Sequence, residues 1–214
     1  MPHFRIGALR RLRGWDAWNV TEDADLGLRL SRFGYRVETL DSPTHEEAPA
    51  RTQAWIAQRR RWIKGWMQTL LVHGHNPARL ARELGLRNAA SALALLANGV
   101  LGPVLSPIFA GLMLRDAIWG DLLCPKTLAG AALSASWIAL AAAGAASLLW
   151  PMALGVRRGG LWREARWLAA LPAYHTLLAI AAWGALFELW LDPFRWSKTS
   201  HGLARTSRRG GYKS

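Results

Sequence analysis

Long uncharged stretches dominate the second part of the chain. Residues 89–114 and 127–156 contain no Asp, Glu, Lys or Arg, and 167–191 contains only Glu188, close to its end. An α-helix needs about 20 apolar residues to cross the hydrocarbon core of a bilayer. The pattern therefore predicts an α-helical transmembrane region over 89–191, built on these three segments.

Positive charge sets the expected orientation of these segments. The connection 157–166 holds four arginines, whereas 115–126 balances Arg115 and Lys126 against two aspartates. Lys and Arg are retained on the cytoplasmic side, so we expect 157–166 and the basic tail 192–214 there. If the chain starts in the cytoplasm and crosses the membrane three times, 157–166 lies in the cytoplasm but the tail 192–214 lies outside. Either the tail crosses despite its charge, or one segment is a re-entrant hairpin or two short helices. Prolines that would allow such kinks are Pro103, Pro107, Pro151 and Pro172.

The first part of the chain, residues 1–88, is polar and carries shorter signals. Thr21 precedes three acidic residues and a set of apolar residues at helical spacing, and Gly34 ends this predicted helix. Residues 35–40 then alternate as a strand does, until Asp41-Ser42-Pro43 stops the alternation. A helix, a glycine and a strand in this order predict an α/β fold.

A second helix is predicted from Pro49 to about His73. Its apolar positions are Trp55, Ile56, Trp62, Ile63, Trp66, Leu70 and Leu71, and its basic positions are Arg59, Arg60, Arg61 and Lys64. Aromatic and aliphatic residues beside a dense basic face are typical of a helix at a membrane surface. We therefore expect this helix to lie on the bilayer.

Composition narrows the expected partners. The net charge is +13 although 51% of the residues are hydrophobic. Such an excess of charge fits the cytoplasmic segments of a membrane protein, so we expect a lipid bilayer as partner and no nucleic acid. Cys124 is the only cysteine, which excludes an intrachain disulfide and a thiolate metal cluster.

The tripeptide Thr21-Glu22-Asp23 is the first candidate for chemistry. Acids in the first turn of a helix are favoured by the helix dipole, so the simplest interpretation is capping. A carboxylate at this place could also take a proton from an acceptor hydroxyl. The tripeptide alone leaves both interpretations open, and Asp16 and Asp25 are alternative carboxylates.

The second candidate is the group Gln58, Arg61 and Trp62. A basic helix is attracted to anionic lipid, which is its simplest interpretation. Arginine also pairs with diphosphates, glutamine donates hydrogen bonds, and an indole face stacks on the apolar face of a sugar ring. This group alone is ambiguous as well.

The two groups become informative in combination. The chain contains GWDAWNVTEDADLGLRL at 14–30, THEEAPARTQAWIAQRRRWIKGWMQT at 44–69 and DPFRWSKTSHGLAR at 192–205. In this order they resemble the membrane-bound family 2 glycosyltransferases, a group that includes bacterial cellulose, hyaluronan and related exopolysaccharide synthases. In that family Thr-Glu-Asp is followed by Gln-x-x-Arg-Trp and then by membrane helices. The third motif is similar to the ending of a bacterial subgroup.

The resemblance implies how an acceptor sugar would be held and activated. Asp23 would be the general base that deprotonates the acceptor hydroxyl, while Thr21 and Glu22 would shape the acceptor site. Trp62 would stack on the acceptor sugar. The reaction implied is an inverting transfer from a nucleotide sugar to a growing glycan or other acceptor.

The donor side of the reaction is only partly represented. The resemblance implies that Gln58 and Arg61 face the pyrophosphate of the donor, and that a divalent metal, Mg or Mn, steadies the leaving group. The family's nucleotide-binding half and its Asp-x-Asp metal motif are not found, since Asp23-Ala24-Asp25 matches that motif only by overlap. We therefore expect the metal ligands outside this chain, and a separate N-terminal half or partner subunit.

The expected organisation follows from these points. Residues 1–88 would be the C-terminal portion of a GT-A-type α/β catalytic domain with an interfacial helix, 89–191 the transmembrane helices, and 192–214 a basic tail. The protein would be a multi-pass protein of the bacterial inner membrane with its catalytic part in the cytoplasm. The alternative is a non-catalytic membrane remnant or anchoring subunit.

Three smaller features have competing interpretations. His73 and His75 with Asn76 suggest a metal site, but two histidines at this spacing without further ligands are more often an ordinary helix end. Arg13 stands where related sequences usually have glycine, which would be unfavourable if that position needs a positive φ. Residues that are either interfacial anchors or part of a gate are Trp196, Lys198 and His201.

Overall fold

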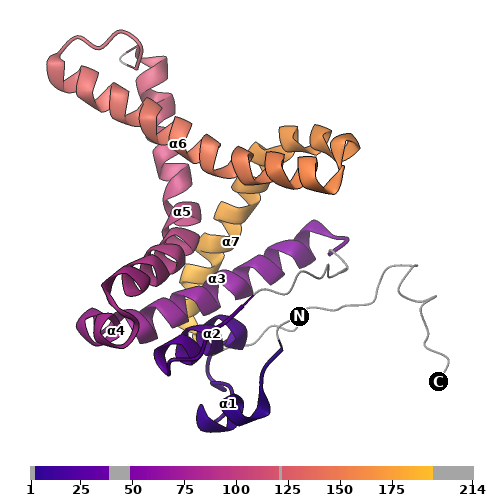
Figure 1. Ribbon diagram of the computed structural model, residues 1–214. Helices are drawn as coiled ribbons and strands as arrows, with labels where there is room; N and C mark the ends of the chain where they lie inside the picture. The colour runs from indigo at the N-terminus through magenta and orange to yellow at the C-terminus, as the bar shows by residue number, and fades with distance from the viewer. Residues whose placement is uncertain (1–2, 39–48, 121, 195–214) are drawn as a thin grey trace. The chain divides into compact units, whose positions relative to one another are not determined.

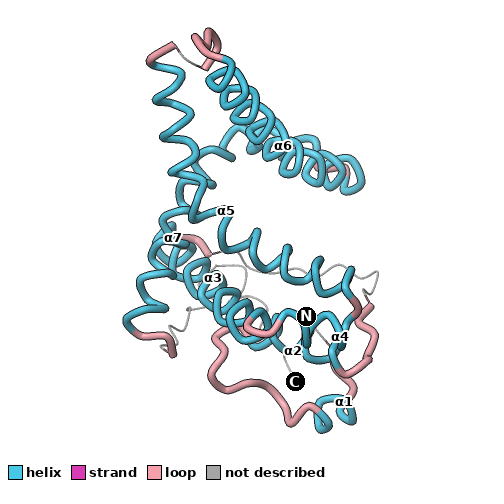
Figure 2. The backbone as a smooth tube through the Cα atoms, turned by 90° about the vertical axis from the view of Figure 1, so that its left-hand side faces the viewer, coloured by secondary structure: helices cyan, strands magenta, loops and turns pink. Residues whose placement is uncertain are grey.

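The computed structural model describes residues 3–38, 49–120 and 122–194. Within these ranges every regular element is a helix and no strand is present (Figure 2). The elements labelled in Figure 1 and the short 3₁₀ helix η1 are α1 (Ile6–Arg11), α2 (Glu22–Arg32), α3 (Thr52–Gly74), α4 (Pro77–Leu84), α5 (Leu86–Ile118), α6 (Leu128–Gly159), η1 (Trp162–Ala170) and α7 (Leu171–Leu191).

The strand predicted over residues 35–40 is the main difference between the expected and the observed fold. Residues 35–38 form no strand, and the remainder of the predicted strand, 39–40, lies outside the described residues. A strand needs a neighbouring strand to accept and donate its backbone hydrogen bonds. Since the described part of this chain offers none, the alternating pattern has no sheet to join and the α/β expectation is corrected to a helical fold.

The predicted helix after Thr21 is present as α2. Its first turn holds Glu22, Asp23 and Asp25, which the helix dipole favours. Gly34 ends it with a φ of 79°, and the Tyr35 backbone N–H reaches back to the carbonyl of Leu30.

The cap itself differs from expectation. Thr21 is the N-cap residue, but its side chain makes no capping hydrogen bond. Its backbone N–H instead donates to Asn19 Oδ1 at 2.9 Å. Thr21 is therefore held by Asn19, two residues before it, and leaves the start of α2 uncapped by a hydroxyl.

The predicted basic helix is present as α3, and its apolar side faces protein. Ile63 and Met67 of α3 form a buried cluster with Val100 of α5 and with three alanines of α7. Alanines allow two helices to approach closely. These alanines are Ala181, Ala182 and Ala185. The buried side of α3 therefore packs against the two candidate membrane helices, and whether its other side lies on lipid stays a prediction.

Three helices are long and apolar enough to cross a membrane: Leu86–Ile118, Leu128–Gly159 and Trp162–Leu191. They contain the three segments expected from the sequence, which confirms these as candidate spans. The third begins as a 3₁₀ helix and becomes α-helical at Leu171. Pro151 lies inside α6 without interrupting it. The number of crossings and the side of each connection stay predictions.

The chain forms two compact units. One contains the residues up to Val104 together with those from Leu177 onward, and the other is Leu105–Thr176. Helices α5 and α7 each contribute to both. The candidate site residues belong to the first unit, where the ends of α5 and α7 pack on α3. The predicted division of the chain near residue 88 remains a sequence-based expectation.

Candidate functional site

The segment before α2 runs along α3. The Asn19 side-chain amide donates to Thr69 Oγ1 at 2.9 Å, and the Val20 backbone N–H donates to Gln68 Oε1 at 3.1 Å. All four residues are buried. Side chains in this buried setting must find partners, so these bonds fix where the chain enters α2.

Thr21 then sits directly against α3. Gly65 lies opposite it, and a Cβ placed on Gly65 would be 2.6 Å from both Cβ and Cγ2 of Thr21 and closer still to its hydroxyl. Only a residue without a side chain fits there. Arg61 and Trp62 precede Gly65 by one helical turn, about 6 Å along the axis. The structure therefore brings the start of the Thr-Glu-Asp motif next to the Gln-x-x-Arg-Trp motif.

The three acidic residues of the α2 start have different surroundings. Glu22 and Asp23 are exposed, and Asp23 Oδ1 accepts a hydrogen bond from the Ala24 backbone N–H at 2.9 Å. Asp25 is only 1% exposed. Asp16, the other alternative carboxylate, is half-buried and accepts from the Trp18 backbone N–H at 2.9 Å. Glu22 and Asp23 are thus both accessible to solvent, and of the two Asp23 holds the position that the family resemblance implies for the base.

The second motif has one buried member and two accessible ones. Gln58 is buried, whereas Arg61 is half-buried and Trp62 is 38% exposed. The Arg61 Nε atom is buried and has no hydrogen-bond partner among the described residues. The guanidinium carbon of Arg59 lies 4.4 Å from the centre of the Trp62 ring. One face of this indole is therefore covered by a cation, a favourable arrangement for both groups.

Lys64 does not belong to the basic surface face that was expected on α3. Its side chain is fully buried, and Nζ lies 2.6 Å from Glu188 Oε1 of α7. Arg60 Nη1 lies 3.9 Å from the other oxygen of Glu188. A buried charge is stable only when it is paired, so Glu188 ties α7 to the helix that carries the second motif.

The end of α7 also reaches this region. Gln68 Nε2 donates to the carbonyl of Pro193 at 2.9 Å. The rings of Trp18 and Phe194 meet edge to face, with their centres 5.1 Å apart. The remaining residues of the third motif, including Trp196, Lys198 and His201, lie outside the described residues.

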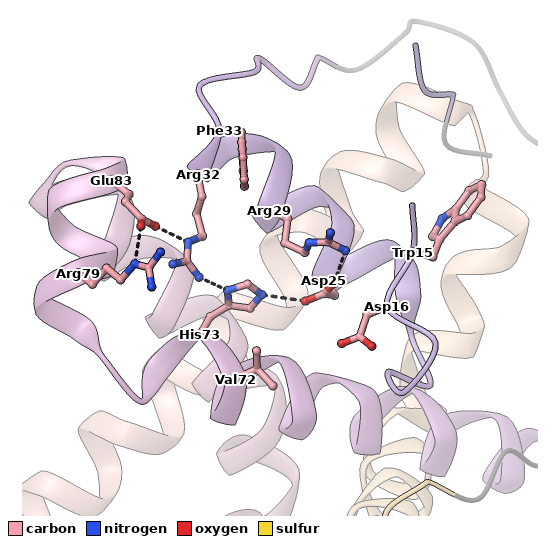
Figure 3. A pocket seen from close by; sticks show the side chains of 10 residues that line it. All are labelled: Trp15, Asp16, Asp25, Arg29, Arg32, Phe33, Val72, His73, Arg79 and Glu83. Atoms are coloured by element: carbon pink, nitrogen blue, oxygen red, sulfur yellow. Dashed lines mark hydrogen bonds and ion pairs between the residues drawn. The ribbon is translucent and has the colours of Figure 1, made fainter. Parts of the chain in front are cut away.

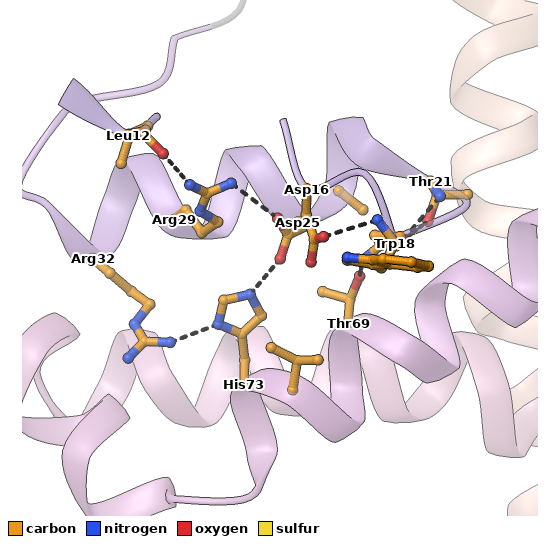
Figure 4. A network of polar contacts seen from close by, with 12 residues as sticks. Leu12, Asp16, Trp18, Thr21, Asp25, Arg29, Arg32, Thr69 and His73 are labelled. Carbon is orange, nitrogen blue, oxygen red and sulfur yellow. Dashed lines mark hydrogen bonds and ion pairs between the residues drawn. The ribbon is translucent and has the colours of Figure 1, made fainter. Parts of the chain in front are cut away.

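A polar network lies beyond the motif, at the far end of α3. Figure 3 shows an open pocket of about 630 Å³ between α2, α3 and α4. His73 is at its floor and contacts Asp25 and Arg32 (Figure 4). Arg32 Nε continues to Glu83 Oε2 at 2.5 Å. The pocket is therefore lined by charged groups that already pair with one another.

The metal interpretation of the histidines finds no ligand set in the described residues. His73 pairs with Asp25, while His75 Nδ1 contacts the carbonyl of Val72 at 2.5 Å. Asn76 caps α4 by accepting from the Arg79 backbone N–H. No three His, Cys, Asp or Glu side chains converge in the described ranges. These groups therefore serve helix ends and helix contacts.

Arg13 has the backbone conformation for which glycine is suited. Its φ is 59°, and it is the non-glycine residue with positive φ in the described ranges. This conformation is unfavourable for an L-residue by about 1–2 kcal/mol. Arg29 donates from α2 to the carbonyls of Leu12 and Gly14 on either side. These bonds hold the strained turn in place.

Glu83 gives the contact between α2 and α4 a defined pH dependence. Its hydrogen bond from Arg32, followed by that from Arg79, lowers the pKa of Glu83 from 4.5 to about 2. Because the pKa is lower in the folded protein, the stabilisation is present above pH 4.5 and is lost as the pH falls toward 2.

We therefore predict that Glu83→Gln lowers the melting temperature slightly at neutral pH. The difference between the variant and the original protein should shrink steadily as the pH is lowered from 4.5 to 2. Thermal unfolding in detergent, followed by circular dichroism at several pH values, measures it. A difference that stays constant over this range would contradict the role of the ionised carboxylate.

Comparisons with known proteins identify the family of this chain. A family model described as glycosyl transferase family group 2 matches residues 3–191. A probable glycosyltransferase of Bacillus subtilis (strain 168), YdaM, is 32% identical over 62 residues, which are 28% of this chain and 15% of that protein. The chain thus corresponds to a small part of this relative. No solved structure matches the chain significantly. Since the family model spans most of its length, the chain belongs to glycosyl transferase family group 2.

Proposed function

We propose that this chain supplies the acceptor side of an inverting glycosyltransferase at the bacterial inner membrane. The sugar would pass from a nucleotide-sugar donor to a growing glycan or other acceptor, on the cytoplasmic face. The observation that supports this best is the contact of Thr21 with Gly65, one helical turn from Arg61 and Trp62. It draws together two motifs that lie more than 30 residues apart in the sequence.

Asp23 is the proposed general base. Its carboxylate is exposed at the first turn of α2, where a hydroxyl of the acceptor can approach it. Asp25 is a poorer candidate because it is buried and already bonded to His73. Thr21 and Glu22 shape the entrance of the acceptor site beside Asp23. A base must lie within hydrogen-bond reach of the proton that it removes.

The proposed reaction is a single displacement. Asp23 takes the proton of the acceptor hydroxyl. An electron pair of the acceptor oxygen then forms a bond to the anomeric carbon of the donor. The bond from that carbon to the phosphate oxygen breaks, and the nucleoside diphosphate leaves with the electron pair. Attack opposite the leaving group inverts the anomeric configuration.

Gln58, Arg61 and Trp62 are the proposed binding residues. The buried and unpartnered Nε of Arg61 is suited to a phosphate oxygen, and Gln58 lies one turn before it on α3. The indole of Trp62 is partly exposed, so its free edge and face are available to an acceptor sugar. Arg59 would move or remain stacked on the opposite face.

The divalent metal implied by the family finds no ligand set among the residues of this chain that the structure describes. Asp25 is paired with His73 and Arg29, and the exposed Asp23 lies outside any cluster of ligands among the described residues. We therefore assign the metal ligands and most of the donor site to a separate part, either an N-terminal half or a partner subunit. No step of the proposed mechanism uses a metal ligand from this chain.

Trp62→Ala tests the proposed function most directly. In membranes that contain the complete protein, we expect the KM for acceptor to rise about tenfold, the size of a lost aromatic contact, while donor affinity changes little. Incorporation of a radiolabelled nucleotide sugar, measured at several acceptor concentrations and, separately, at several donor concentrations, gives both values. Trp119→Ala, an exposed residue of the other unit, is the control. No incorporation by the original protein, or unchanged acceptor kinetics in Trp62→Ala, would contradict the proposal.

A further inference from the structure

His73 joins two helices from a buried position. It lies in the last turns of α3 and is 3% exposed. Its Nε2 is 2.8 Å from Asp25 Oδ1, and its Nδ1 is 2.7 Å from Arg32 Nη1. Figure 4 shows the imidazole between these two side chains of α2. Both ring nitrogens are therefore engaged.

The chemistry of its partners determines the hydrogens on the ring. A guanidinium has donors and no acceptor, so His73 Nδ1 accepts the hydrogen bond from Arg32. The hydrogen must then be on Nε2, which donates to the carboxylate of Asp25. His73 is thus a neutral imidazole with no nitrogen left for a substrate. This arrangement excludes it as a proton acceptor in catalysis and leaves it a role in holding α2.

The contact with Asp25 lies just beyond the proposed acceptor motif. Asp25 follows Asp23 by two residues, within the same helical turn. On the other side of the motif, Asn19 bonds Thr69 and Val20 bonds Gln68. The motif is therefore attached to α3 both before and after its three residues. Between the two attachments, Thr21 is close to α3.

The attachment after the motif is braced by a third helix. Arg32 bonds both His73 and Glu83, and Glu83 also accepts from Arg79 at 2.7 Å. Arg29 adds an ion pair to Asp25 at 3.5 Å. The contact of His73 with Asp25 is buried, and charged hydrogen bonds in such a setting hold their members in one arrangement. The contacts of Glu83 with Arg32 and Arg79 are exposed and extend this arrangement to α4. Figure 3 shows that the chain of contacts runs from α4 through α2 to α3.

We propose that His73 is a positioning residue of the transferase, which sets the register of α2 on α3 and so the place of the Asp23 carboxylate. The effect of His73 on catalysis rests on the proposed function, whereas its effect on the position of α2 does not. The bond from Nε2 to Asp25 is the essential contact. The bond to Arg32 keeps the ring in the tautomer that can make it.

Two variants separate the two ring nitrogens. The amide of His73→Gln reaches the place of Nε2 and can donate to Asp25, whereas the shorter His73→Asn places its oxygen near Nδ1 and can only accept from Arg32. Both variants replace the imidazole ring with an amide and leave the length of α3 unchanged. If His73 only filled space, the two variants would change the stability of α2 to a similar extent. Alternatively, the smaller side chain of His73→Asn would weaken the whole protein and not α2 in particular.

Hydrogen exchange tests the proposal without catalysis. In His73→Asn we expect the amides of Leu26–Leu30 in α2 to exchange about tenfold faster or more, the effect of one lost hydrogen bond to a charged group. The amides near Val100 in α5 should be unchanged. In His73→Gln both sets should stay within about threefold of the original protein. Equal acceleration in both variants, or none in His73→Asn, would overturn the proposal.

Transfer kinetics test the link to catalysis. His73→Asn should lower kcat about tenfold or more with donor KM unchanged, because the base is displaced while the donor site is not. His73→Gln should restore most of kcat. If the exchange result holds but kcat is unchanged in His73→Asn, then His73 positions α2 and the assignment of Asp23 as base fails. If Asp23→Asn is inactive and the exchange result fails, the positioning role is wrong and the base assignment stands.

Discussion

Asp23→Asn is expected to reduce sugar transfer about 10²–10⁴-fold, the usual contribution of a positioned general base. The amide keeps the size of the side chain and accepts the same hydrogen bond from Ala24, but it cannot take a proton from the acceptor. Donor binding should be nearly unchanged, because the proposed contacts to the pyrophosphate come from α3. Single-turnover transfer and equilibrium binding of the nucleotide, measured on the complete protein in membranes, separate the two.

Glu38→Gln is the matched control for this prediction. Glu38 is an exposed acid that follows the same helix and has no proposed role. Its replacement should leave transfer within about twofold, as expected for a surface substitution. Equal loss of donor binding and transfer in Asp23→Asn would contradict the assignment of Asp23 as general base. Full transfer activity in this variant would contradict it as well.

Gly65→Ala is expected to have the second largest effect. The new Cβ would lie 2.6 Å from two carbons of Thr21, closer than van der Waals contact permits. Overpacking of this kind typically costs about 1–3 kcal/mol. Here the easiest relief is to move the start of α2 away from α3. A displacement of about 1 Å at a catalytic group can lower kcat about 10²-fold, so activity should fall much more than stability.

Gly27→Ala separates this effect from helix propensity. Gly27 lies in α2 with no atom within 4 Å of the position of an added Cβ. The same substitution there should stabilise the helix by about 0.5–1 kcal/mol, or leave it unchanged, with full transfer activity. Melting temperature and kcat are measured for both variants. Normal activity in Gly65→Ala would show that the contact between Thr21 and α3 is not needed for catalysis.

Several elements of the fold were predictable because their causes are local. The three apolar segments become helices because their length and hydropathy are sufficient for a membrane span. Helices α2 and α3 follow from the spacing of apolar residues and from Gly34 as a stop. The glycine usual at the position of Arg13 in related sequences raised the question of a positive φ there, and the structure shows one. The predicted strand failed because a strand depends on a partner elsewhere.

The candidate site was predictable in its residue types and not in its arrangement. Resemblance to a family singled out Asp23, Arg61 and Trp62 before their positions were known. Gly65 and Gln68 were passed over, although both follow the second motif on the same helix, because a glycine and a glutamine inside a helix have no local signature of function. The structure explains them by the contacts with Thr21 and Val20.

Sequence by itself determined that α2 and α3 form, which segments are apolar enough for a membrane, and to which family the chain is related. Tertiary structure decided which charges are buried. Lys64 was expected on a basic face at the membrane surface, but it is buried against Glu188, which lies 124 positions away. His73 was expected at an ordinary helix end, but Asp25 lies 48 positions away and buries it. Local patterns reflect hydropathy and backbone preference, whereas the pairing of buried charges depends on which helices pack together.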